Sequence, residues 1–208
     1  MDNGHCGPCQ SLVMKLTFLL SIMASTLQAQ HADNLPYREI PDYPDHYKAG
    51  TVAARIIDGV GFRYYWASEG LRPKDLIYQP GEGARTTEET LFHLYELSIN
   101  ILNTAKKQPN EKEQVNSRLS YAELRAATLN NLKEASNRLK AHKEDSLEEF
   151  NLVYQGARGT ATFPFWNLLN GPIADALWHI GQVVSQRRSS GNPLSNKANV
   201  LTGKVAKE

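Results

Sequence analysis

Residues 86–106 read TTEETLFHLYELSINILNTAK. The stretch opens with a threonine that can cap a helix and with two acids, Glu88 and Glu89, in the first turn, where the helix dipole favours negative charge. A mainly apolar stripe follows at intervals of three and four positions, and Pro109 comes after it: Leu91, Leu94, Tyr95, Ser98, Ile101 and Leu102. This spacing predicts one amphipathic helix whose apolar face needs partners from elsewhere in the chain.

Three other segments have the same helical spacing. They cover residues 51–68, 119–143 and 171–188. Pro172 suits the first turn of the last segment, because a proline there loses no helical hydrogen bond. We interpret residues 71–85 as a loop and residues 146–170 as irregular, since glycine and proline interrupt a short strand-like run there. Four amphipathic helices with little strand signal predict an all-α fold, a four-helix bundle.

The first residues predict export. Lys15 precedes a short apolar run and a stretch of small and polar residues, which is typical of a secretory signal peptide over residues 1–29. The apolar run is much shorter than the roughly 20 residues of a membrane-spanning helix. A start at Met14 would make residues 1–13 a mis-assigned extension. We therefore expect a periplasmic or secreted protein with no stable membrane insertion.

Beyond the signal peptide we expect three parts. Three prolines within residues 30–50 predict an extended arm, because each proline interrupts a helix. Residues 51–194 are long enough for one domain with one core, and they contain the four predicted helices. The polar residues 195–208 predict a flexible tail.

Composition limits the function classes. Cys6 and Cys9 have the spacing of a redox pair, but we interpret them as inert, because no strand precedes them and a signal peptide follows. The net charge of +1 gives no strong attraction to nucleic acid. Arg187 and Arg188 form too short a basic run for an anion site, and cations are favoured near a helix C-terminus in any case.

Two residues of the last predicted helix could share a metal ion. Asp175 and His179 are four positions apart, so their side chains lie one turn above each other. His93 stands on the helix of residues 86–106. Zinc and nickel bind imidazole and accept carboxylate, and three protein ligands with an open position are typical of a catalytic site. A reading without metal stays open, because an acid in a first helical turn is favoured by the helix dipole alone.

The strings ETLFHL at 89–94 and DALWHIGQV at 175–183 resemble the DinB-like superfamily. The later Gly191-Asn192-Pro193 is also similar to its last-helix signature. This resemblance implies a right-handed bundle with up-down-down-up helices, and a metal bound by a histidine of the second helix and a His-x3-His pair on the last. Asp175 replaces the first histidine of that pair, which changes the charge and softness of the ligand set.

Several neighbouring side chains are candidates for supporting roles. Glu89 and Glu96 lie within one turn of His93, so either could orient the imidazole or act as a base, and a solvated helix face is the alternative. Gln182 is a third candidate of this kind. A ligand groove could involve Tyr65, Trp66, Glu69 and Trp178. For the aromatic cluster on the first helix we favour a role in the core, because that is the commoner use of aromatic side chains.

The leading hypothesis is a divalent-metal-dependent enzyme in which the ion lowers the pKa of a water or a thiol. The resemblance implies a hydrolase or a thiol-dependent transferase acting on a small molecule, and often a homodimer. Export favours hydrolysis, or no catalysis, over thiol transfer, since an exported protein meets little low-molecular-weight thiol. The alternative hypothesis is a non-catalytic ligand-binding or dimerisation module with a degenerate metal site.

Overall fold

The structure is a computed structural model, and it describes residues 35–111, 115–157 and 159–206. Contacts divide the chain into Met1–Leu35 and Pro36–Glu208, and every helix and strand discussed below belongs to the second unit. The predicted signal peptide and the two cysteines lie outside the described residues. Among the described residues, no helix has both the length and the apolar character needed to cross a membrane.

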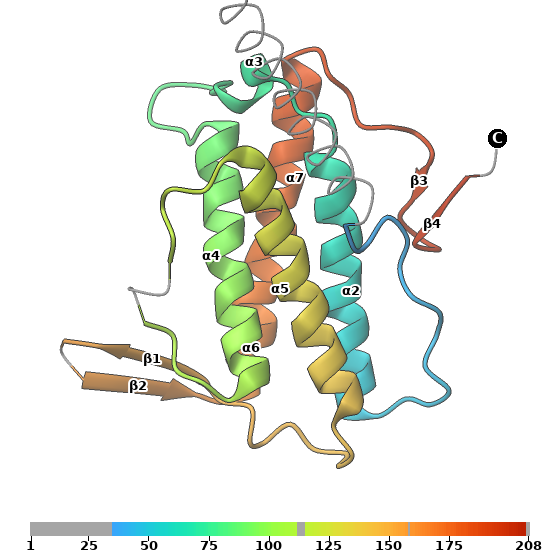
Figure 1. Ribbon diagram of the computed structural model, residues 1–208, viewed down its shortest axis with the longest axis vertical. Coiled ribbons are helices and arrows are strands. Elements are labelled where there is room, and N and C mark those ends of the chain that lie inside the picture. Colours follow the sequence, from blue (N-terminus) through green and yellow to red (C-terminus); the bar gives the residue numbers. More distant parts are fainter. Residues whose placement is uncertain (1–34, 112–114, 158, 207–208) are drawn as a thin grey trace, which may run out of the picture. The chain divides into compact units, whose positions relative to one another are not determined.

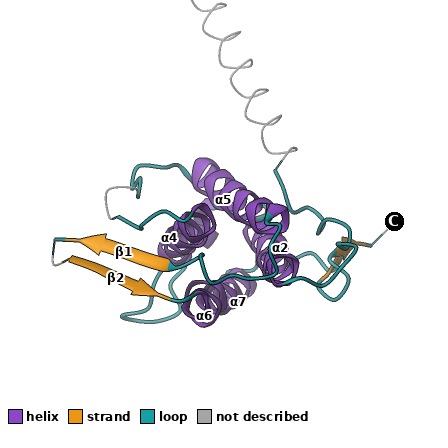
Figure 2. Cartoon of the chain, turned by 90° about the horizontal axis from the view of Figure 1, so that it is seen from below, coloured by secondary structure: helices purple, strands orange, loops and turns teal. Residues whose placement is uncertain are grey.

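The second unit is mainly helical, as the sequence predicted (Figure 1). Its four long helices are α2 (Ala49–Ser68), α4 (Thr87–Lys106), α5 (Tyr121–Ala141) and α7 (Ala174–Ser189). Helices α5 and α7 each pack against both α2 and α4, as the end-on view in Figure 2 shows. Apolar side chains from all four helices are buried between them, including Ile57, Ile101, Leu129 and Val183.

Contacts at the helix ends define the chain directions. The Tyr121 hydroxyl donates to the Ser68 carbonyl, so the start of α5 lies at the end of α2. Arg187, near the end of α7, donates to the carbonyls of Trp66 and Ala67 at the same end of α2. Gln186, also near the end of α7, donates to the Arg85 carbonyl just before α4. Helices α2 and α7 therefore run in one direction, whereas α4 and α5 run in the other, and this can be followed in Figure 1.

Local sequence explains where α4 and α5 begin. Thr86 and Glu89 form a reciprocal cap, in which the Thr86 amide donates to the Glu89 carboxylate at 2.8 Å and the Glu89 amide donates to the Thr86 hydroxyl at 3.2 Å. Ser120 and Glu123 form the same arrangement at α5. Each cap satisfies amides that have no partner within the helix. The predicted start of the helix at Thr86 is confirmed.

The prediction of an irregular segment over residues 146–170 was wrong. Strands β1 (Leu152–Gly156) and β2 (Gly159–Phe163) form an antiparallel hairpin that extends away from the helices (Figure 2). Every residue of β2 is exposed, so β2 lacks the apolar alternation by which a half-buried strand is recognised. Gly159, with φ +112°, adopts a backbone conformation close to the turn that only glycine reaches easily.

A helical turn precedes α7. Helix α6 (Phe165–Leu168) continues into the π-helical turn η2 (Leu169–Ile173), and the backbone leaves the helical region at Gly171, with φ −96° and ψ −107°. Pro172 follows this kink, which explains how a proline is tolerated there. Helix α7 itself begins at Ala174, slightly later than predicted, so Asp175 lies in its first turn.

The arm contacts both α2 and the tail. Residues 35–48 contain no helix or strand, and the Tyr37 ring lies so close to Gly61 that a Cβ there would collide with it. In the tail, which we expected to be flexible, β3 (Ala198–Asn199) pairs with β4 (Lys204–Val205). The Gly203 carbonyl in this hairpin accepts a hydrogen bond of 2.8 Å from the Ile40 amide. One other short helix, α3 (Pro73–Leu76), lies within the predicted loop of residues 71–85.

Candidate metal centre

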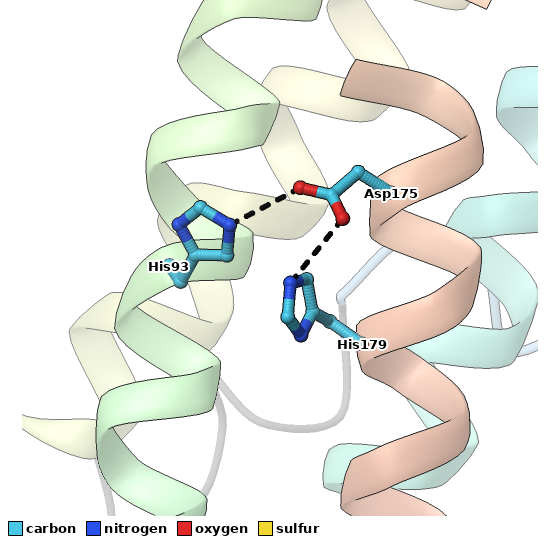
Figure 3. A group of neighbouring side chains, drawn as sticks. All are labelled: His93, Asp175 and His179. Atoms are coloured by element: carbon cyan, nitrogen blue, oxygen red, sulfur yellow. Dashed lines mark hydrogen bonds and ion pairs between the residues drawn. The ribbon is translucent and has the colours of Figure 1, made fainter. Parts of the chain in front are cut away.

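The structure brings His93, Asp175 and His179 together between α4 and α7 (Figure 3). His93 is in the second turn of α4, and Asp175 and His179 lie on successive turns at the start of α7. Each residue offers one ligand atom, and these three atoms all lie within 4.8 Å of one another. The three residues selected from sequence spacing and resemblance therefore form one cluster.

The Asp175 carboxylate lies between the two imidazoles. Its Oδ2 is 3.2 Å from His93 Nε2, and its Oδ1 is 3.3 Å from His179 Nε2. The two rings are perpendicular, with 4.7 Å between their centroids. Both histidines therefore direct the same ring nitrogen, Nε2, towards one point between the helices.

The other ring nitrogen of each histidine also has a partner. His93 Nδ1 is 3.3 Å from the Glu96 carboxylate, and His179 Nδ1 is 2.8 Å from Gln182 Oε1. When Nδ1 carries the proton it donates to these acceptors, and the lone pair on Nε2 is then available to an ion. Glu96 and Gln182 thus lie where each can orient one imidazole, which is the role considered for them from the sequence.

Glu89 has a different role. Its carboxylate accepts from the backbone amide and the hydroxyl of Thr86, and these two bonds lower the pKa of Glu89 below its ordinary value. The side chain is therefore committed to the cap of α4, and the structure gives it no hydrogen bond to His93.

The three residues could hold a divalent ion. His93 and His179 approach different oxygens of Asp175, and the three ligand atoms lie within 4.8 Å of one another, so modest side-chain rotations would bring them round one zinc ion with bonds of about 2.0–2.1 Å. Two imidazole nitrogens and one carboxylate oxygen suit zinc or nickel. The side chains of His93, Asp175 and His179 are 23%, 44% and 12% exposed, so the site is open to water on one side.

Two cavities flank the cluster. The first, here called the α4 cavity, has a volume of about 440 Å³ and lies between the first turns of α4 and the start of α5, with His93 in its wall. The second, the α7 cavity, has a volume of about 750 Å³ and lies between one face of α7 and the loop Tyr78–Arg85, with His179 in its wall. Both volumes are in the range of small-molecule sites.

Only one of the four predicted groove residues lines a cavity next to the cluster. Trp178 is in the wall of the α7 cavity and is 72% exposed. Tyr65 is buried, with the Arg125 guanidinium 4.5 Å from its ring centroid, and Glu69 forms an ion pair with the same arginine. The Trp66 indole donates to the Arg38 carbonyl of the arm at 3.1 Å. These three residues therefore stabilise the end of α2.

The residues on the loop side of the α7 cavity were not predicted from the sequence. Arg85 and Tyr78 come from the loop before α4, where no periodic pattern marks them. Gln186 was also missed, although two glutamines four positions apart, Gln182 and Gln186, are a signal that one face of α7 is polar.

In comparisons with family models, curated proteins and solved structures, none matched this chain. The resemblance to the DinB-like superfamily therefore stays a prediction from the sequence strings. The chemistry of the cluster stands apart from it, because two imidazoles and a carboxylate that converge near water can bind a divalent ion in any fold.

Proposed function

We propose that this chain is a divalent-metal-dependent enzyme of the DinB-like superfamily, with the ion bound by His93, Asp175 and His179. The observation that carries the proposal is the convergence of these three side chains from two helices. Each histidine also has an acceptor at its outer nitrogen, and this arrangement orients metal-binding imidazoles in many proteins.

The helix directions support the family assignment. Helices α2 and α7 run one way and α4 and α5 the other, which is the up-down-down-up order expected of a DinB-like four-helix bundle (Figure 1). The candidate ligands also stand on the second and last long helices, as the resemblance implies. We propose this bundle as the fold of residues 51–194.

The chemistry we propose is hydrolysis or thiol-dependent transfer on a small molecule. When bound, a zinc or nickel ion would supply Lewis acidity and lower the pKa of a water or thiol that reaches it. The chain's own contribution is to hold two imidazoles and one negative carboxylate in place. Glu96 and Gln182 fix the ring orientations, and the partly exposed Asp175 leaves one side open to substrate.

We also propose that the protein is exported to the periplasm or secreted, and that it pairs as a homodimer. Export rests on the sequence of residues 1–29 alone. An exported location would favour hydrolysis over thiol transfer.

Metal content is the deciding measurement. The protein is purified without a metal-binding tag, loaded separately with zinc and nickel, and analysed by elemental mass spectrometry beside His93→Ala/His179→Ala. We expect about one ion per chain, lost in the double variant, because two of three ligands are gone. Asp175→Asn, which keeps the shape but removes the charge, is expected to reduce the metal content.

Two results would contradict the proposal in different ways. Unchanged metal content in Asp175→Asn would mean that Asp175 is only a helix-start acid. Empty wild-type protein after both loadings would overturn the metal-dependent enzyme, and a non-catalytic ligand-binding or dimerisation module would then be the better explanation of the fold.

A further inference from the structure

The α7 cavity has an ordered wall on both sides. Gln186 donates to the Arg85 carbonyl at 3.2 Å, which ties the loop to α7. Within and next to the loop, the Gln79 amide donates to the Ala84 carbonyl at 2.7 Å, and the Thr87 amide donates to the Tyr78 carbonyl at 3.0 Å. The cavity is therefore bounded by a loop that is hydrogen-bonded at several points.

Among the described residues, the lining of the α7 cavity has a positively charged side chain and no negatively charged one. Arg85 is the one Lys or Arg in its wall, and no Asp or Glu lines it among the described residues. Hydrogen-bond donors line it as well. Gln182 uses its oxygen for His179, which leaves its amide N–H groups for a ligand, and Ser185 contributes a hydroxyl. A wall with a cation, several donors and no carboxylate favours an anion that accepts hydrogen bonds.

The α4 cavity, in contrast, is lined mainly by negative charge. Three acids line it, Glu88, Glu89 and Glu96, and their charges oppose an anionic ligand. Arg85 lies in the wall of both cavities and forms no ion pair within 4 Å with any described residue. The positive charge of Arg85 contributes to the lowered pKa of Glu89, whose carboxylate already accepts hydrogen bonds from Thr86. An anion in the α7 cavity would thus meet a cation that has no close carboxylate partner.

The cavity also offers an aromatic surface. Trp178 is 72% exposed although it lies beside the metal centre, and Tyr78 lies in the facing wall. Gly181 also lines the cavity, and it has open space at the position of a Cβ. An exposed ring such as Trp178, with the half-buried Tyr78 in the wall of the same cavity, favours the flat apolar part of a ligand.

We infer that the α7 cavity binds a small aromatic carboxylate, with the carboxylate at Arg85 and the ring against Trp178. This deepens the proposed function by naming the class of substrate, and it rests on that function only for the claim that the bound acid is turned over. His179 lines the cavity, so a ligand held there lies beside the metal centre.

The test compares 3-phenylpropionate with its neutral isostere 3-phenylpropionamide, titrated onto chelator-treated full chain and followed by ligand-observed NMR. We expect the acid to bind and the amide to bind at least several-fold more weakly. Arg85→Gln is expected to weaken binding of the acid about threefold to tenfold and to leave the amide unaffected, because one partly exposed charge pair is lost. Trp178→Ala is expected to weaken both probes.

Matched variants keep the test specific. Arg188→Gln removes an exposed arginine of α7, and Trp166→Ala removes a tryptophan that is 75% exposed. Neither residue lines a cavity described above. Both should bind the acid as the wild type does. Equal binding of acid and amide, or an equal loss in Arg188→Gln and Arg85→Gln, would overturn the inference.

The binding experiment and the metal experiment can fail independently of each other. If the chelator-treated protein binds the acid through Arg85 but the chain takes up no metal, the cavity stands and the metal-dependent enzyme fails. If the acid binds only after zinc loading and is indifferent to Arg85→Gln, the metal centre stands and the α7 cavity assignment fails.

Discussion

Asp58 and Asp175 are carboxylates on two long helices, and their surroundings are opposite. Asp58 is fully buried on α2 and accepts from the Tyr37 hydroxyl at 3.0 Å, the Ser136 hydroxyl at 2.6 Å and the Lys140 ammonium at 2.5 Å. Asp175 is 44% exposed, and its polar partners among the described residues are two imidazoles. A buried carboxylate whose two oxygens both accept from the protein holds elements together, whereas a partly exposed one between histidines keeps capacity for a ligand.

The partners of Asp58 come from separate parts of the fold. Tyr37 belongs to the arm, and Ser136 and Lys140 belong to α5. Burial and the neighbouring Asp58 charge raise the pKa of Tyr37, so its hydroxyl stays protonated and donating. The cluster therefore joins the arm, α2 and α5, and it contributes to stability rather than to the metal centre.

The largest effect that would test this contrast is expected for Asp58→Ala. The change leaves two hydroxyls and an ammonium without their acceptor, and removing one member of a buried ion pair costs about 3–5 kcal/mol. Denaturant unfolding should show this loss with unchanged metal content. Asp175→Ala, measured without metal, should cost less than about 1 kcal/mol because its side chain is partly exposed to water. Equal losses in the two variants would remove the distinction.

Asp75 extends the comparison to a second buried carboxylate. Its side chain is fully buried and accepts from Arg72, Ser190 and Asn192. The hydrogen bond from the Arg72 guanidinium, with those from Ser190 and Asn192, holds the pKa of Asp75 well below its usual range. Asp75→Asn is expected to cost about 2–3 kcal/mol at pH 7, because bonds to a charged group are lost.

The pH dependence of this cost has a definite sign. A depressed folded pKa contributes stability that is complete above the unfolded value of about 4 and is lost as the pH falls towards the folded value. The wild type and Asp75→Asn should therefore converge in unfolding free energy below about pH 4. Glu88→Gln, at an exposed position of α4, is the matched control and should change little. A constant difference from pH 7 to pH 2 would mean that the charge of Asp75 is not what stabilises this end of the fold.

The smallest effect concerns the orientation of His179. Gln182→Ala removes the acceptor at Nδ1 but leaves all three candidate ligands, and loss of such a partner lowers metal affinity about 10- to 100-fold. Zinc competition against a chromophoric chelator measures the change. Gln182→Glu keeps an acceptor at this position and should restore most of the affinity. Wild-type affinity in Gln182→Ala would show that the imidazole is oriented without this contact.

Local features of the fold were predictable from the sequence. Thr86 and Glu89 marked the start of α4 because a capping box involves neighbours three positions apart. The β1–β2 hairpin was not predictable in the same way, since β2 is exposed throughout and β1 is buried only at its start, so neither strand buries alternate residues. Arg187 shows a third case. Its position predicted only a cation favoured at a helix C-terminus, but it is 4% exposed and bonded to two carbonyls of α2.

The candidate site was predictable in part. Asp175 and His179 are neighbours within one helix, so their spacing alone placed them together. His93 was proposed as the third ligand from another helix and was supported by the resemblance, and the structure supplied the contact. The arginine and the aromatic rings of the α7 cavity could not be combined from the sequence, because they come from a loop without a repeating pattern and from a helix far along the chain.

By itself the sequence determined the long helices, the caps of α4 and the pair Asp175 and His179, because these depend on interactions within one or two helical turns. The tertiary structure decided which polar residues meet across the chain. His93 lies 82 positions from Asp175, and Asp58 lies 82 positions from Lys140. Nothing in that spacing separates a candidate metal centre from a structural ion pair. Burial distinguishes them, because a ligand cannot reach a carboxylate that is enclosed among protein donors, whereas it can reach a carboxylate beside water.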